Sequence, residues 1–130
     1  METTDSGSGQ SREAAGDSDR PVDLDGEAEL DAFVDANPVA LVEFYTDGCG
    51  VCASMEPVLG NVARASEAAV GLVNPRDDPP LVDRFDVRSV PTLVLFVDGE
   101  PVARRAEGFV GADDLVSWVE DERGTDGTCA

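Results

Sequence analysis

The architecture of this chain can be inferred from Val39-Ala40-Leu41-Val42-Glu43-Phe44-Tyr45, a nearly uninterrupted run of apolar and aromatic residues. The run is too short and too uniformly apolar for a surface helix, so it predicts a strand that is covered on both faces. Strands of this kind lie at the centre of parallel sheets, where helices pack on either side. We therefore expect an α/β fold with a central mixed β-sheet and helices on both faces.

Two cysteines follow this strand in the segment Cys49-Gly50-Val51-Cys52, immediately before a helical pattern. A bridge that closes so short a loop stabilises a fold by only about 2 kcal/mol, so a structural staple is a weak explanation for the pair. A helix N-terminus favours a thiolate and lowers the pKa of a cysteine there. The pair is therefore interpreted as an exchangeable dithiol in which Cys49 is the attacking sulfur.

The hydrophobic periodicity predicts the remaining elements in the order βαβαβαββα. Helices are expected over Glu27–Ala36, from the dithiol to about Ala69, within 79–85, and around Leu115, Trp118 and Val119, which we take as core residues. Strands are expected over Val22–Leu24, Val70–Val73, Thr92–Val97 and Pro101–Gly108, with a hairpin turn at Asp98-Gly99. The middle strands of the sheet should be parallel and its last hairpin antiparallel.

The chain carries 28 acidic residues against nine basic ones, all of them arginine, and contains no histidine. This excess of negative charge argues against a nucleic-acid partner. Only five of the acidic residues lie in residues 1–20, so the acidity belongs to the folded part. Dense carboxylates without lysine resemble the surfaces of proteins from salt-accumulating halophilic archaea, where a screening length of about 3 Å at 1 M salt relieves the self-repulsion.

The composition predicts a single domain over residues 21–123. Residues 1–20 are acidic and nearly devoid of apolar side chains, so we expect a disordered tail, and residues 124–130 should form a flexible C-terminal tail with Cys129 exposed. The sequence has no signal-peptide-like apolar stretch in residues 1–20 and no membrane span. We expect a cytoplasmic monomer that has no membrane association.

The sequence resembles the thioredoxin family from Val22 to Glu122, through four features in the family's order. These are the strand followed by the CxxC segment, Pro57 five residues after the second cysteine, the Val90-Pro91-Thr92 sequence, and Phe96-Val97-Asp98-Gly99 with a later Gly108. The resemblance implies a thioredoxin fold and a thiol–disulfide oxidoreductase. It also implies protein disulfides as substrates, an upstream electron donor of the thioredoxin-reductase kind, and no bound cofactor, because the cysteines carry the electrons.

The resemblance assigns roles to individual residues. Cys49 would be the nucleophile and Cys52 the resolving thiol, with exchange through a mixed disulfide. Pro91 corresponds to the family's cis-proline, and the backbone of Val90 would bind an extended substrate strand. Glu43 occupies the place of a buried acid that takes the proton from Cys52, and burial would raise its pKa.

The chain departs from the family pattern close to the dithiol. Gly48 stands where a tryptophan is usual, which removes an aromatic wall next to the nucleophile, and Val51 replaces a common proline. Gly48 and Gly50 are expected to be among the residues that bind the substrate. Leu72 falls where many members carry a lysine close to the buried acid. These differences leave the direction of electron flow open.

Two alternatives use the same residues differently. The cysteines would supply half of a zinc site, but four ligands are needed and Cys129 is the only further cysteine. A thioredoxin fold can also serve as a non-catalytic adaptor or chaperone-like binding module, because a fold does not determine a function.

Overall fold

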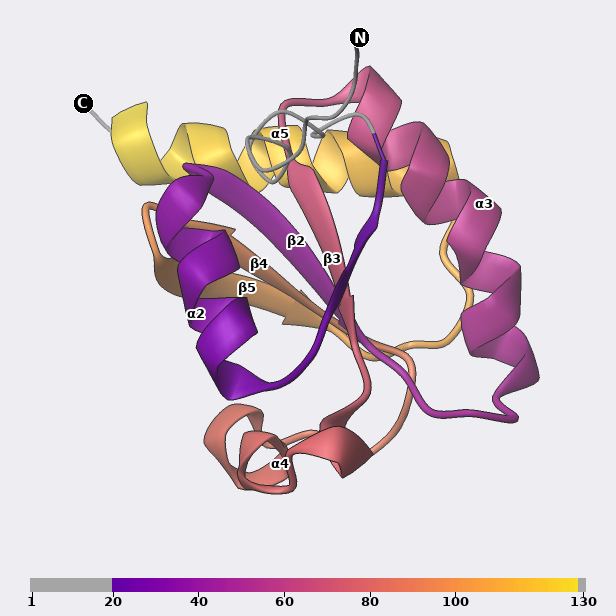
Figure 1. Cartoon of the computed structure of the whole chain (residues 1–130). Coiled ribbons are helices and arrows are strands. Elements are labelled where there is room, and N and C mark those ends of the chain that lie inside the picture. Colours follow the sequence, from indigo (N-terminus) through magenta and orange to yellow (C-terminus); the bar gives the residue numbers. More distant parts are fainter. Residues whose placement is uncertain (1–19, 129–130) are drawn as a thin grey trace, which may run out of the picture.

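The sheet of this domain has five strands in the order β1-β3-β2-β4-β5 (Figure 1). The computed structural model describes residues 20–128, and side chains up to residue 122. The strands are β1 (Val22–Leu24), β2 (Val39–Phe44), β3 (Ala69–Val73), β4 (Thr92–Val97) and β5 (Glu100–Arg105). The helices are α2 (Glu27–Ala36), α3 (Gly50–Ala65), a 3₁₀ turn at Pro75–Asp77, α4 (Pro80–Phe85) and α5 (Ala112–Thr128). This element order confirms the expected architecture.

The central strand is β2, as the uniform apolar run predicted. It pairs in parallel with β3, which in turn pairs in parallel with β1. Its other neighbour, β4, runs antiparallel to it, as does β5 to β4. The expectation that the middle strands are parallel was therefore wrong on one side of β2. The 18 residues between β3 and β4 include α4 at one end of the sheet, and they return the chain in the opposite direction.

The alternation of side chains along β2 divides the core into two layers. Val39 and Leu41 face the cluster that contains α3 and α5, whereas Ala40, Val42 and Phe44 face the cluster beneath α2 and α4. By this period of two, Glu43 belongs to the α3 side. The acid at the end of β2 is therefore directed toward the helix that follows the dithiol.

Helix α3 ends at Ala65, earlier than the sequence pattern suggested. Ser66 has extended dihedral angles, and both its backbone N–H and its hydroxyl donate to the Val62 carbonyl. The Ser66 hydroxyl oxygen also accepts a hydrogen bond from the Ala68 N–H, which brings the chain directly into β3. A serine that satisfies backbone groups in this way competes with continuation of the helix.

Two other boundaries differ from the expectations. Strand β5 ends at Arg105 instead of Gly108, and α5 continues to Thr128, past the expected domain boundary at residue 123. Glycines 124 and 127 disfavour a helix by about 1 kcal/mol each, but they keep the backbone N–H that a proline lacks. The expected N-terminal tail and Cys129 lie outside the described residues.

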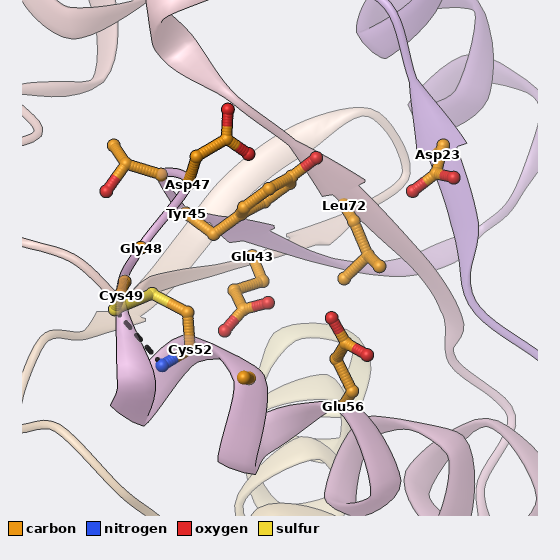
Figure 2. A pocket seen from close by; sticks show the side chains of 11 residues that line it. Asp23, Glu43, Tyr45, Asp47, Gly48, Cys49, Cys52, Glu56 and Leu72 are labelled. Atoms are coloured by element: carbon orange, nitrogen blue, oxygen red, sulfur yellow. Dashed lines mark hydrogen bonds between the residues drawn. A yellow bond between two sulfur atoms is a disulfide. The ribbon is translucent and has the colours of Figure 1, made fainter.

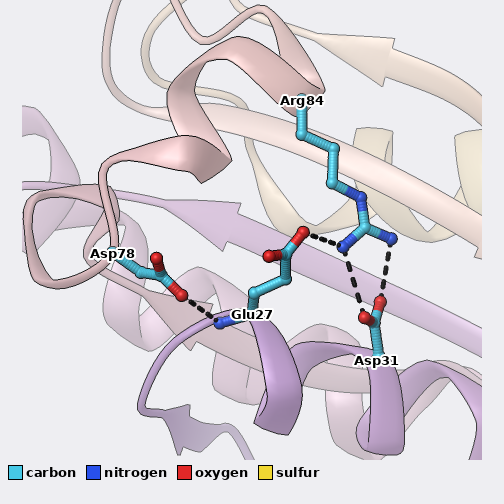
Figure 3. Close-up of polar contacts among 4 residues, drawn as sticks. All are labelled: Glu27, Asp31, Asp78 and Arg84. Atoms are coloured by element: carbon cyan, nitrogen blue, oxygen red, sulfur yellow. Dashed lines mark hydrogen bonds and ion pairs between the residues drawn. The ribbon is translucent and has the colours of Figure 1, made fainter.

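Helix α2 is stabilised by residues from the segment that contains α4 (Figure 3). Its N-cap, Gly26, has no side chain, and Asp78 instead accepts a hydrogen bond of 2.8 Å from the Glu27 N–H. Arg84 on α4 contacts Glu27 at 2.6 Å and Asp31 at 2.8 Å. A carboxylate at a helix N-terminus is favourable, so Asp78 replaces a local capping residue.

Candidate active site

The dithiol lies where β2 passes into α3. The Cys49 N–H donates to the Thr46 carbonyl at 3.3 Å, closing a turn, and Cys49 then forms the N-cap of α3. The N–H of Cys52 donates to the Cys49 sulfur at 3.1 Å. The two sulfurs are joined in a disulfide, with Cα atoms 5.3 Å apart. The sequence prediction that these cysteines form one redox pair at a helix N-terminus agrees with this geometry.

The two sulfurs differ in accessibility. Cys52 is 4% exposed, whereas Cys49 is only partly buried. Cys52 lies one turn before Met55 and Glu56 on α3, and Met55 is completely buried against the sheet. An external disulfide can therefore reach Cys49 more easily than Cys52.

Both glycines of the predicted substrate surface leave the rim of the site open. Gly48 has a φ of +82°, which an L side chain rarely adopts, and no atom lies within 4 Å of where its Cβ would be. Gly50 is likewise unobstructed. The departure from tryptophan at position 48 thus goes with a backbone conformation that favours glycine.

The Val90–Pro91 peptide bond is cis, as the resemblance implied. Pro91 precedes Thr92, which pairs with Phe44 across β2 and β4. Pro91 therefore lies at the same end of the sheet as the turn that leads to Cys49. Its role in binding substrate, like that of Val90, stays a prediction.

Glu43 is 1% exposed, and its Oε2 atom is buried without a hydrogen-bond partner among the described residues. Burial raises the pKa of its carboxyl group to about 8, and the negative charge of Glu56 adds to this effect. Leu72 is the residue opposite Glu43 on β3. The position predicted from the family to carry a neighbouring cation is therefore occupied by an apolar side chain.

A cavity of about 190 Å³ connects the buried acid with the dithiol (Figure 2). Glu43 from β2 and Glu56 from α3 extend into the same space, next to the Cys52 side of the disulfide. The lining residues are Asp23, Glu43, Tyr45, Thr46, Asp47, Gly48, Cys49, Cys52, Ala53, Glu56 and Leu72. The acid and the two cysteines therefore border the same cavity.

Asp23, Asp47 and Glu56 are residues of the cavity that were not predicted from the sequence. The position of Glu56 near the dithiol could have been inferred from the sequence, because Glu56 follows Cys52 by four residues and must share its helix face. The position of Asp23 could not have been inferred in this way, since Asp23 reaches the cavity only because β1 pairs with β3. Burial, and then the negative charges of Asp23 and Asp47, raise the pKa of Tyr45, which lines the same cavity.

The segment before α5 also packs beside the dithiol helix. The N–H of Val110 donates to the Met55 sulfur at 3.4 Å, one turn beyond Cys52. The preceding side chain, Phe109, is 57% exposed, and Val51 between the cysteines is 42% exposed. Phe109 was not predicted from the sequence to belong to the site.

No group of three His, Cys, Asp or Glu side chains is arranged to hold a metal ion within the described part of the chain. None of the helices there is long and apolar enough to cross a bilayer.

Comparison with known proteins adds independent evidence. Residues 22–121 match the family model for thioredoxin. A thioredoxin of Chlamydia caviae is 37% identical over 85 residues, which is 65% of this chain and 82% of that protein. A thioredoxin of Mycobacterium tuberculosis is 38% identical over 88 residues, or 66% and 75% of the two chains.

Among solved structures, a point mutant of a thioredoxin from Halobacterium salinarum NRC-1 aligns with a TM-score of 0.76 and 38% identity, covering 81% of this chain and 92% of that one. Together with the disulfide between Cys49 and Cys52, these matches establish both fold and chemistry. The chain belongs to the thioredoxin family and is a thiol–disulfide oxidoreductase.

Proposed function

We propose that the protein reduces protein disulfides, with Cys49 as the nucleophile and Cys52 as the resolving thiol. The Cys49 thiolate attacks one sulfur of the substrate, and the other substrate sulfur leaves as a thiolate that takes a proton from water. Cys52 then attacks the Cys49 sulfur, and the second substrate thiol is released. Two electrons pass to the substrate, and the Cys49–Cys52 disulfide remains. The single observation that carries this assignment is the partly exposed Cys49 at the start of α3, with the buried Cys52 within bonding distance.

The α3 N-terminus supports the assignment of the nucleophile. The Cys52 N–H that donates to the Cys49 sulfur would stabilise a thiolate there, as would the positive end of the helix dipole. No cationic side chain lines the cavity within the described residues, so these backbone groups must provide most of the stabilisation.

We propose that Glu43 exchanges a proton with Cys52 during resolution. The carboxyl group and the Cys52 sulfur face the same cavity, and a pKa of about 8 brings the acid close to the ordinary range of a thiol. Groups with similar pKa values transfer protons readily in both directions. Glu43 would thus accept the proton when Cys52 attacks and return it when the disulfide is reduced again.

The substrate would lie as an extended strand against the rim of the site. The backbone of Val90 before cis-Pro91 would hydrogen-bond this strand, and the open backbone at Gly48 and Gly50 would allow close approach. Phe109 would add apolar contact.

Cys52→Ser tests the order of attack. This variant keeps the nucleophile but cannot resolve the mixed disulfide, so substrate proteins are expected to remain bound to Cys49. The measurement is a non-reducing gel of protein recovered from cells, compared with a dithiothreitol-treated sample. Cys49→Ser/Cys52→Ser is the matched control. Absence of dithiothreitol-sensitive adducts, or equal adducts in the control, contradicts the assignment.

We further propose that the protein works as a monomer in the cytoplasm of salt-accumulating cells, where a thioredoxin-reductase-like enzyme supplies electrons. The net charge of −19 supports this setting, because the like charges repel one another unless salt screens them. The unfolding temperature is expected to rise between about 0.1 M and about 1 M KCl, as the screening length falls from about 10 Å to about 3 Å. A thermal-unfolding series in which this temperature stays constant or falls contradicts the proposal.

A further inference from the structure

The cavity beside the dithiol combines negative charge with a buried acceptor that has no partner. Four of its lining residues are acids, and the structure gives this cavity no cationic side chain among the described residues. The Glu43 side chain is 1% exposed, and its Oε2 atom accepts no hydrogen bond from any residue that the structure describes. A buried polar atom without a partner calls for an explanation, and a donor group that a substrate brings into the cavity would provide one.

We propose that this cavity binds an ammonium or guanidinium group of the substrate, so that the protein prefers disulfides flanked by lysine or arginine. The inference rests on the proposed function, because it places the cation on the molecule that Cys49 attacks. An entering N–H group would donate to Glu43 and lie next to Glu56, which extends into the same space (Figure 2). Hydrogen bonds between charged groups are stronger than those between neutral ones.

The position of the cavity limits where the substrate cation can be. Cys49 and Cys52 are themselves lining residues, so the occupant of the cavity lies beside the attacked disulfide. Consecutive Cα atoms are about 3.8 Å apart, and a basic side chain one residue away from the substrate cysteine can therefore reach the cavity. Leu72, which lies beside Glu43 on the neighbouring strand, also lines the cavity, and it carries no charge that would compete with a substrate cation for the acids.

An entering cation would favour the ionised form of Glu43 and so act against its raised pKa, which burial and, after it, the charge of Glu56 cause. Asp23, Asp47 and Tyr45 are the other titratable groups of the cavity besides the two cysteines. The carboxylates of Asp23 and Asp47 would also attract a cation into the cavity.

Two chromogenic peptides test the inference. In Gly-Lys-Cys-Lys-Gly and Gly-Ser-Cys-Ser-Gly the cysteine forms a mixed disulfide with thionitrobenzoate, and attack by Cys49 on the peptide sulfur releases the coloured thiolate. Second-order rate constants are measured with fully reduced protein in 1 M KCl, where a screening length of about 3 Å suppresses long-range attraction. We expect the lysine peptide to react about tenfold faster with the wild type.

The variants locate this preference. Glu56→Gln is expected to lower the ratio of the two rates from about ten to below about three, and Leu72→Lys, which places a cation of the protein in the cavity, should bring it close to one. Glu120→Gln removes an exposed carboxylate of α5 that does not line the cavity, and it should leave the ratio unchanged.

Three results would overturn the inference. A wild-type ratio near one, while both peptides react, refutes the cation site and leaves the proposed function intact. An equal fall of the ratio in Glu56→Gln and Glu120→Gln assigns the preference to diffuse surface charge instead of the cavity. If neither peptide reacts, the proposed function fails and the inference fails with it.

Discussion

Serine in place of Cys49 is expected to lower catalysed disulfide reduction by about 10³-fold or more, leaving only the rate of the small-molecule reductant. A serine hydroxyl is not ionised near neutral pH and cannot form a disulfide with the substrate, so the first step is lost completely. The measurement is the rate at which dithiothreitol reduces a test protein disulfide, with and without catalytic amounts of the variant, in molar KCl.

Cys129→Ser is the matched control for the loss of a thiol. It should retain the wild-type rate, because Cys49 and Cys52 form a complete redox pair without it. Equal rates for the wild type and Cys49→Ser would favour the adaptor interpretation, in which the dithiol is idle.

Glutamine in place of Glu43 is expected to stabilise the oxidised protein relative to the wild type as the pH rises. The pKa of Glu43 is about 8 in the folded protein, against an ordinary value of 4.5, so the folded state binds this proton more tightly than the unfolded state. The stabilising contribution of the protonated acid is complete below pH 4.5, and it is lost as the pH rises to about 8. The total loss is on the order of 5 kcal/mol, because one pKa unit corresponds to about 1.4 kcal/mol.

The measurement is the free energy of unfolding of the wild type and of Glu43→Gln between about pH 5 and pH 9, from denaturant titrations of the disulfide form. The disulfide prevents Cys49 and Cys52 from titrating. The difference between the two proteins should grow with pH by up to about 1.4 kcal/mol per unit. Glu120→Gln on the surface of α5 controls for the loss of one negative charge.

A pH-independent difference between the wild type and Glu43→Gln would contradict the raised pKa.

The same variant tests the proton-transfer role in the reduced enzyme. The step at which Cys52 releases the substrate should slow by about 10²-fold at neutral pH, as is typical when a general base is removed. A stopped-flow measurement of the mixed-disulfide lifetime gives this rate, and an unchanged lifetime argues that Glu43 is only a structural acid.

The sequence alone was sufficient to predict those features that depend on residues close together in the chain. The uniform apolar run of β2 correctly predicted its central place, and the alternation along it explains why Glu43 faces α3. The hydrophobic periodicity correctly predicted helix α2 over Glu27–Ala36, where Leu30, Phe33 and Val34 are buried. The cis peptide bond before Pro91 followed from the family resemblance alone.

Features that depend on contacts between distant segments could not be predicted in the same way. Asp78 caps α2 from 51 residues away, and nothing local to either segment indicates this pairing. The antiparallel direction of β4 depends on the path of the chain around α4. Asp23 joins the cavity only through the strand order, so the concentration of acids around Glu43 becomes visible only in three dimensions.

The location of the site at the junction of β2 and α3 has a consequence for its dynamics. Glu43 lies on a strand bonded to neighbours on both sides, and such backbone opens to solvent only when most of a domain unfolds. Cys49, by contrast, lies in a turn as the N-cap of a helix, where local opening requires much less free energy. The sulfur that must adapt to each incoming protein therefore has conformational freedom, whereas the acid behind it keeps its position throughout the exchange.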